Sequence, residues 1–226
     1  MSKTDDLANW YLRLNGFLTI PNFILHPSRP GSQRTEADVI GVRFPFRREF
    51  EGQDFDDAKL QCSLNKPSIF LVEVKTRVHK LNEAWKNSNK ANINKVLADL
   101  GFFESDDCIA SVAQNLYNFG RSDNKSFYCS LLFIGNVDAA RVPTEYSSVP
   151  RILWEEIIAF IHKRFRTYFG IKAQHEQWDE VGQKLYQFAV DHEDLARFEE
   201  KVRNYCLLPA ARVAVAPEPV RPSFRR

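Results

Sequence analysis

The stretch Ser68–Thr76, S-I-F-L-V-E-V-K-T, decides the fold that we expect for this chain. Read as a β-strand, it places alternate side chains on two faces, and both faces are apolar as far as Val72. This pattern indicates a central strand that is covered on both sides. Glu73 and Lys75 then share one face near the end of the strand, where charged groups are costly to bury unless they are paired or used.

A second strand with acidic residues at one end is expected at Thr35–Phe44, T-E-A-D-V-I-G-V-R-F. Glu36 and Asp38 share a face at the beginning of this strand. If the two strands pair antiparallel, the beginning of the second lies beside the end of the first. We therefore expect four charged side chains to form one cluster: Glu36, Asp38, Glu73 and Lys75.

The composition is that of a folded protein without a strong overall charge. The chain has 226 residues, of which 44% are hydrophobic and 13% aromatic, so it can bury a core and is unlike a disordered sequence. Its net charge is +2, which means that nucleic-acid binding would have to rest on local basic patches.

Cysteine spacing and hydropathy exclude further classes of protein. The four cysteines include no C-x-x-C pair, which argues against a zinc or iron–sulfur site. No apolar run has the length of a membrane span, and the first residues carry no signal-peptide core. We expect a soluble, cytoplasmic protein without a membrane partner.

Helical periodicity surrounds these strands. It predicts helices starting at Thr4, over Leu81–Leu100, from Ser105 to Gly120 and over Ile152–Phe169, with a strand at Ser126–Gly135. Two more helical patterns follow, and the last residues are rich in Pro, Ala, Val and Arg without a period. The expected organisation is an α/β core over residues 1–170, a helical C-terminal extension over 171–207 and a flexible tail over 208–226.

The acidic cluster has the residue types that hydrolysis of a phosphodiester requires. Magnesium prefers hard oxygen ligands and needs only one or two carboxylates, which Asp38 and Glu73 could supply. The Lys75 ammonium, two residues after Glu73 on the same face, could position the attacking water or stabilise negative charge on the phosphate. The residues thus indicate metal-assisted hydrolysis of a phosphate ester.

The motifs T-E-A-D-V-I-G-V and F-L-V-E-V-K-T resemble the PD-(D/E)xK nuclease superfamily, with Ala37 in place of the proline. The opening D-D-L-A-N-W-Y-L-R-L-N-G-F is similar to the first helix of archaeal Holliday-junction resolvases. The resemblance covers about residues 4–135, and it implies a restriction-endonuclease-like αβββαβ core with a mixed central sheet flanked by helices.

In function, the resemblance implies a nuclease that depends on Mg²⁺ or Mn²⁺ and cleaves DNA in restriction, repair or phage defence. Asp38 and Glu73 would hold the metal, and Lys75 would complete the catalytic set. Asp5 matches the acid of the first helix by position, with aspartate in place of the usual glutamate. Glu36 matches an accessory acid that lies two residues before the metal-binding aspartate.

Other basic residues are candidates for contacts with DNA. Arg77 follows the Glu73–Lys75 strand, Lys90 and Lys95 belong to the Asn/Lys-rich segment, and Lys163 lies in a basic run. The alternative for these lysines is a solvated helix face. For Asp5 we favour a helix N-terminal charge over a role at the metal, and Glu36 could form an ion pair with Arg34 or Arg77.

Two other functions remain open at the level of the sequence. The chain could be a non-catalytic nuclease-fold module that binds DNA or a partner subunit, or a structural α/β protein without a nucleic-acid role. The sequence specifies neither the DNA structure that is recognised nor the position of the cut. It also leaves a homodimer or a complex with a partner subunit open.

Overall fold

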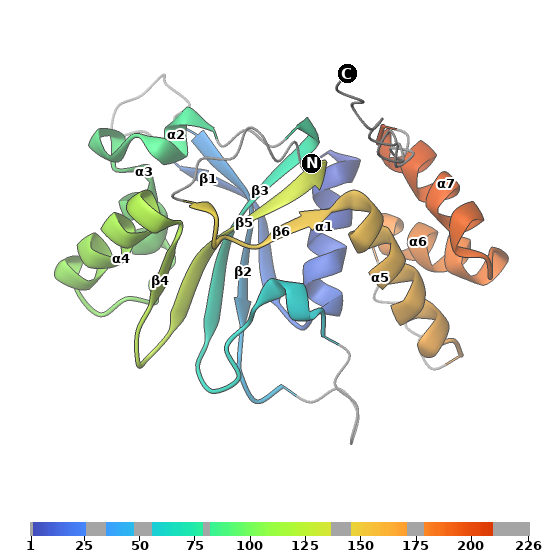
Figure 1. Cartoon of the computed structure of the whole chain (residues 1–226), viewed down its shortest axis with the longest axis horizontal. Helices are drawn as coiled ribbons and strands as arrows, with labels where there is room; N and C mark the ends of the chain where they lie inside the picture. The colour runs from blue at the N-terminus through green and yellow to red at the C-terminus, as the bar shows by residue number, and fades with distance from the viewer. Residues whose placement is uncertain are drawn as a thin grey trace, which may run out of the picture.

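The computed structural model describes residues 2–25, 35–47, 56–78, 82–136, 146–170 and 179–209. These residues form an α/β fold in which helices flank both faces of a mixed, open, six-stranded sheet (Figure 1). The strands are β1 Leu18–Leu25, β2 Thr35–Arg43, β3 Ser68–Val78, β4 Arg121–Asp123, β5 Tyr128–Asn136 and β6 Arg151–Leu153. The α-helices are α1 Lys3–Leu14, α2 Glu83–Lys86, α3 Asn92–Asp99, α4 Asp106–Phe119, α5 Trp154–Thr167, α6 Glu180–Asp191 and α7 Leu195–Cys206.

β3 is central, as the sequence predicts, because it lies between β2 and β5 in the order β1-β2-β3-β5-β4. It pairs antiparallel with β2, with Val39 opposite Val72, and parallel with β5, with Ile69 opposite Cys129. The predicted antiparallel pairing of the two acidic strands is therefore confirmed. β6 adds a second parallel partner for the end of β5.

Alternation along β3 divides the core into two layers. Phe70, Val72 and Val74 face a cluster that includes α1, α5, α6 and α7. Ile69 and Leu71 face the opposite cluster, which includes α2, α3 and α4. Figure 1 shows these two groups of helices on either side of the sheet. The prediction of a mixed central sheet that is flanked by helices is therefore confirmed.

The single helix predicted over Leu81–Leu100 is wrong. The described part of this segment contains α2, a 3-10 turn at Ser88–Lys90 and α3. Ala91 separates the last two with a left-handed backbone at φ 51°, a conformation that no helix interior allows.

The helix predicted over Ile152–Phe169 begins later, at Trp154, because Arg151–Leu153 form β6. In the described part of the chain, no helix combines the length and the apolar character that crossing a membrane requires.

Candidate functional site

The candidate site lies where β2 separates from β3. The β2–β3 ladder runs from Arg43 opposite Ser68 to Val39 opposite Val72. Just beyond it, Asp38 Oδ2 accepts a hydrogen bond of 2.6 Å from the backbone N–H of Val74. The Asp38 side chain therefore takes the place that a backbone carbonyl would occupy in a continuing ladder.

Glu73 and Lys75 form an ion pair at the same end of β3. The Lys75 ammonium lies 2.5 Å from Glu73 Oε1, and the Glu73 residue is only 5% exposed while the Lys75 side chain is 34% exposed. Oε1 is buried, and the Lys75 ammonium is its charged partner. The Trp154 indole donates a 3.1 Å hydrogen bond to the Lys75 carbonyl, which ties the end of β3 to α5.

Burial dominates the electrostatics of Asp38. It raises the pKa of this carboxyl to about 6, and the Val74 amide partly offsets the rise by donating to the charged form. The Glu73 carboxylate raises the Asp38 pKa further, whereas the Lys75 ammonium lowers it. These Coulombic effects mean that the structure brings Asp38, Glu73 and Lys75 into one electrostatic unit.

Burial also raises the pKa of Glu73, and several donors act against it. The Lys75 ammonium lowers this pKa through its charge, and hydrogen bonding by the Trp85 side chain and the Asn82 backbone lowers it as well. Both carboxyls thus have a pKa above the ordinary value, so ionising both requires additional positive charge nearby.

Asp5 lies at the N-terminal end of α1, and its charge acts on Asp38. Its carboxylate accepts a hydrogen bond of 3.1 Å from the Ser2 amide, and its own amide donates to the Ser2 hydroxyl, which together form a capping box. The same carboxylate contributes to the raised pKa of Asp38. Asp5 is therefore a helix-capping residue that also lies near the candidate site.

The structure does not bring the other predicted residues into this site. Glu36 is exposed, lies opposite Ile24 of β1, and makes no hydrogen bond or ion pair with the described residues. Arg34 and the side chain of Arg77 lie outside the described parts. The expected four-residue cluster is thus reduced to Asp38, Glu73 and Lys75.

The lysines predicted to contact DNA lie on opposite sides of the sheet. Lys90 and Lys95 accompany α3, whose buried residues belong to the layer with Ile69 and Leu71. Lys163 lies on α5, which packs in the other layer. The described residues do not gather these three side chains on one face.

Two contacts of the site have no signal in the sequence. Trp85 lies in an Asn- and Lys-rich segment and gives no periodic pattern, although its side chain reaches Glu73. Trp154 has the pattern of a core residue, and it is buried, but its indole also holds the Lys75 backbone. Both contacts depend on how distant elements pack against the end of β3.

The donor set suits a hard divalent cation. Two carboxylates are sufficient for Mg²⁺, which keeps several waters, and the Asp38 and Glu73 carboxylates lie close enough for the charge of one to raise the pKa of the other. No group of three or more His, Cys, Asp or Glu side chains that could hold a metal occurs among the described residues. Carboxylate and water oxygens are the ligands that magnesium and manganese prefer, whereas zinc sites are built mainly from His and Cys.

Comparison with known proteins gives no independent assignment. The chain matches no protein-family model, no curated protein and no solved structure.

Proposed function

We propose that the protein is a divalent-metal-dependent nuclease of the PD-(D/E)xK type that hydrolyses phosphodiester bonds in DNA. The observation that carries the proposal is the convergence of Asp38, Glu73 and Lys75 at the point where β2 leaves β3. The two carboxylates can bind a hard cation, and the Lys75 ammonium beside them can donate a hydrogen bond to a phosphate or a water.

The order of the elements supports a restriction-endonuclease-like core. α1 is followed by three antiparallel strands, β1 to β3, then by helices on the opposite face, and then by β5, which pairs parallel with β3. Apart from the three-residue β4, which precedes β5, this order agrees with the αβββαβ order that the sequence resemblance implies. In that arrangement the acidic ends of β2 and β3 are the expected place for catalysis.

Each residue has a distinct chemical role in the proposed reaction. Asp38 and Glu73 would hold Mg²⁺ or Mn²⁺, which when bound supplies positive charge to the phosphate and lowers the pKa of a water. Lys75 is partly exposed, so its ammonium can donate a hydrogen bond to the attacking water or to a phosphate oxygen. The Val74 amide holds Asp38 in place during the reaction.

A DNA-cleavage assay with matched variants tests this proposal. Wild type is expected to cut plasmid, linear or branched DNA with Mg²⁺ or Mn²⁺ but not with EDTA. Lys75→Ala and Asp38→Asn are expected to lose about 10²-fold or more, because each removes a group that stabilises the transition state.

Lys66→Ala is the matched control. Lys66 lies just before the beginning of β3, at the end opposite to the site, and the substitution removes its ion pair with Asp123. It is expected to cleave like wild type. The nuclease proposal is wrong if wild type leaves all three DNA forms intact with either metal, or if Lys75→Ala cleaves as fast as Lys66→Ala.

The Glu73–Lys75 contact also favours a second function, a non-catalytic module that binds DNA or a partner subunit. In this candidate, Lys75 neutralises Glu73 permanently, so no cation is needed. It predicts DNA retention that falls steeply with salt, is unaffected by EDTA and occurs without cleavage.

A further inference from the structure

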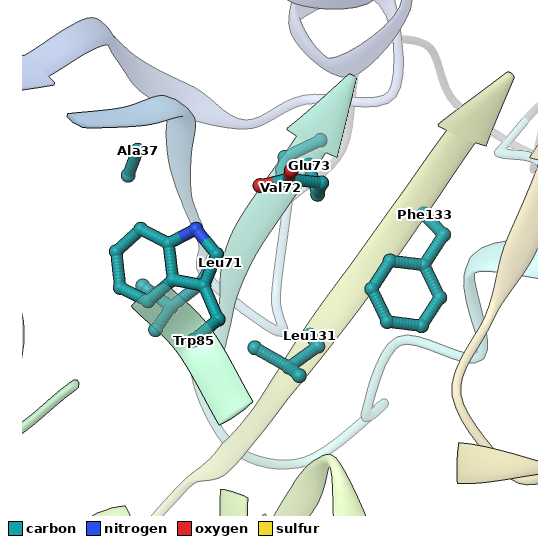
Figure 2. Close-up of a pocket in the computed structure, with 7 residues that line it drawn as sticks. All are labelled: Ala37, Leu71, Val72, Glu73, Trp85, Leu131 and Phe133. Atoms are coloured by element: carbon teal, nitrogen blue, oxygen red, sulfur yellow. The ribbon is translucent and has the colours of Figure 1, made fainter. Parts of the chain in front are cut away.

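Little free space remains beside Glu73 on the side that faces α2. The pocket there has a volume of about 10 Å³, just enough for one water. It is lined by Ala37, Leu71, Val72, Glu73, Trp85, Leu131 and Phe133 (Figure 2). Because most of these side chains are apolar, the Glu73 carboxylate depends on donors of the protein on this side.

Trp85 is the side chain that supplies such a donor. It is 3% exposed, and it belongs to the hydrophobic layer that also includes Leu71 and Phe133. Figure 2 shows the edge of its ring that carries the nitrogen turned toward the Glu73 carboxylate. The indole N–H can only donate, so in this contact the Glu73 carboxylate is the acceptor.

The segment that starts α2 adds a second donor. The Asn82 backbone N–H also bonds to Glu73, so two neighbouring groups of one short segment hold the same carboxylate. A tryptophan ring that is packed on both sides has little freedom to rotate. Among the described residues, the Glu73 carboxylate is therefore held from α2 by Trp85 and Asn82, while its Oε1 pairs with Lys75.

The donors from α2 differ from Lys75 in one respect that matters for a cation. An indole and an amide carry no net charge, so they orient the carboxylate without neutralising it. Lys75, by contrast, competes with a cation for the same charge. Neutral donors behind a metal ligand orient it, and their loss weakens metal binding.

We propose that Trp85 is a positioning residue that fixes the Glu73 carboxylate for a divalent cation, with the Asn82 backbone as a second donor. This inference rests on the proposed function, since it assumes a cation at Glu73 and Asp38. It predicts that removing the indole N–H while keeping the ring raises the metal concentration for half-saturation by about 10–100-fold. Cleavage at saturating metal is expected to recover toward the wild-type rate.

The first test uses the wild-type protein and needs no activity. Its indole N–H resonances are assigned with Trp→Phe variants and followed by ¹H–¹⁵N NMR during titration with MgCl₂. The Trp85 resonance is expected to shift with saturation, whereas that of Trp10, which donates to Asp179, is expected to stay. Saturable Mg²⁺ binding that leaves the Trp85 resonance unmoved would overturn the positioning role.

The second test compares Trp85→Phe with Trp10→Phe by Mn²⁺ calorimetry, by metal-dependent cleavage and by thermal unfolding. The two variants are matched because both residues are buried and both donate an indole hydrogen bond to a carboxylate. Only Trp85→Phe is expected to weaken Mn²⁺ binding. Equal Mn²⁺ affinities for the two variants, with normal cleavage by wild type, reject the inference and leave the nuclease function standing. A wild type that neither binds Mn²⁺ nor cleaves DNA rejects both.

Discussion

At the scale of single residues, the site holds more negative charge than its own ammonium offsets. Asp38 and Glu73 are both shifted toward their neutral forms by burial, and Lys75 is the cation that acts on both. Such an arrangement costs stability when both carboxyls ionise, and it is typical of sites that are completed by a ligand. The energetic cost gives two measurable consequences.

The first consequence is a stabilising substitution. With a folded pKa of about 6 against 3.8, Asp38 keeps its proton in the folded state while the unfolded state has lost it, so the free energy of unfolding falls as pH rises from about 4 to 6. Asp38→Asn keeps an acceptor for the Val74 amide and removes this cost. Without metal, we expect it to be more stable than wild type at pH 7.5 by about 1–2 kcal/mol, after discounting for solvent screening.

Urea unfolding of both proteins at pH 4 and pH 7.5 measures this effect. The difference between them is expected at the higher pH and to shrink at the lower one, where the folded state keeps the Asp38 proton and the unfolded state, with a pKa of 3.8, is only partly ionised. An Asp38→Asn protein that is less stable than wild type at pH 7.5 would show that the carboxylate is compensated within the apo protein.

The second consequence concerns metal binding and pH. A cation binds the ionised carboxyls, so it must displace the Asp38 proton below a pH of about 6. We expect Mn²⁺ affinity, measured by calorimetry, to rise with pH until about pH 6–7 and then to level off. Affinity that is constant from pH 5 to pH 8 would place the metal away from Asp38.

At the scale of elements, the alternation of apolar residues in strands and their helical periodicity were sufficient to predict most of the long elements. β2, β3, β5 and α4 have patterns that their own sequences carry, and the central position of β3 beside an antiparallel β2 followed from them. β4 and β6 have three residues each, too few for a period, and exist because β5 offers them a partner. Trp85 escaped prediction for a related reason, since its contact depends on how the chain turns after β3.

The break between the 3-10 turn and α3 provides a prediction at this scale. Ala91 adopts φ 51°, which is unfavourable for a residue with a Cβ but not for glycine. We expect Ala91→Gly to raise the free energy of unfolding by up to about 1 kcal/mol. Ala98→Gly, on the exposed face of α3, is the control and is expected to lower it by about 1 kcal/mol. Urea unfolding distinguishes the two, and a loss of stability in both would show that Ala91 is not strained.

At the scale of the whole molecule, α6 and α7 share one core with the sheet. Leu185, Phe198 and Val202 belong to the same buried cluster as the sheet residues Phe70 and Val72. α1 lies between them, because it contacts β1, β2 and β3 as well as α5, α6 and α7. The sequence predicted residues 171–207 as an extension of the core. Because α6 and α7 pack on the sheet through α1, unfolding measurements can show whether they unfold together with it.

The contact between α6 and α1 is the most direct place to measure it. Gly182 of α6 lies against the ring of Trp10, and a Cβ built on it would be 2.0 Å from the nearest ring carbon. That ring is 4% exposed and is also held by its hydrogen bond to Asp179, so it has little room to move. We expect Gly182→Ala to cost about 1–3 kcal/mol through overpacking. Gln183→Ala, on the exposed side of α6, is expected to be nearly neutral.

Two probes of unfolding then separate a shared core from an appended one. Far-UV circular dichroism follows all helices, and the indole resonance of Trp85 follows the candidate site on the other face of the sheet. If the helices after residue 179 are part of one cooperative unit, Gly182→Ala lowers the midpoint of both probes equally, since a perturbation at α6 is transmitted to the sheet through α1. If they are an extension that unfolds separately, the dichroism shows an early transition and the Trp85 midpoint stays at the wild-type temperature.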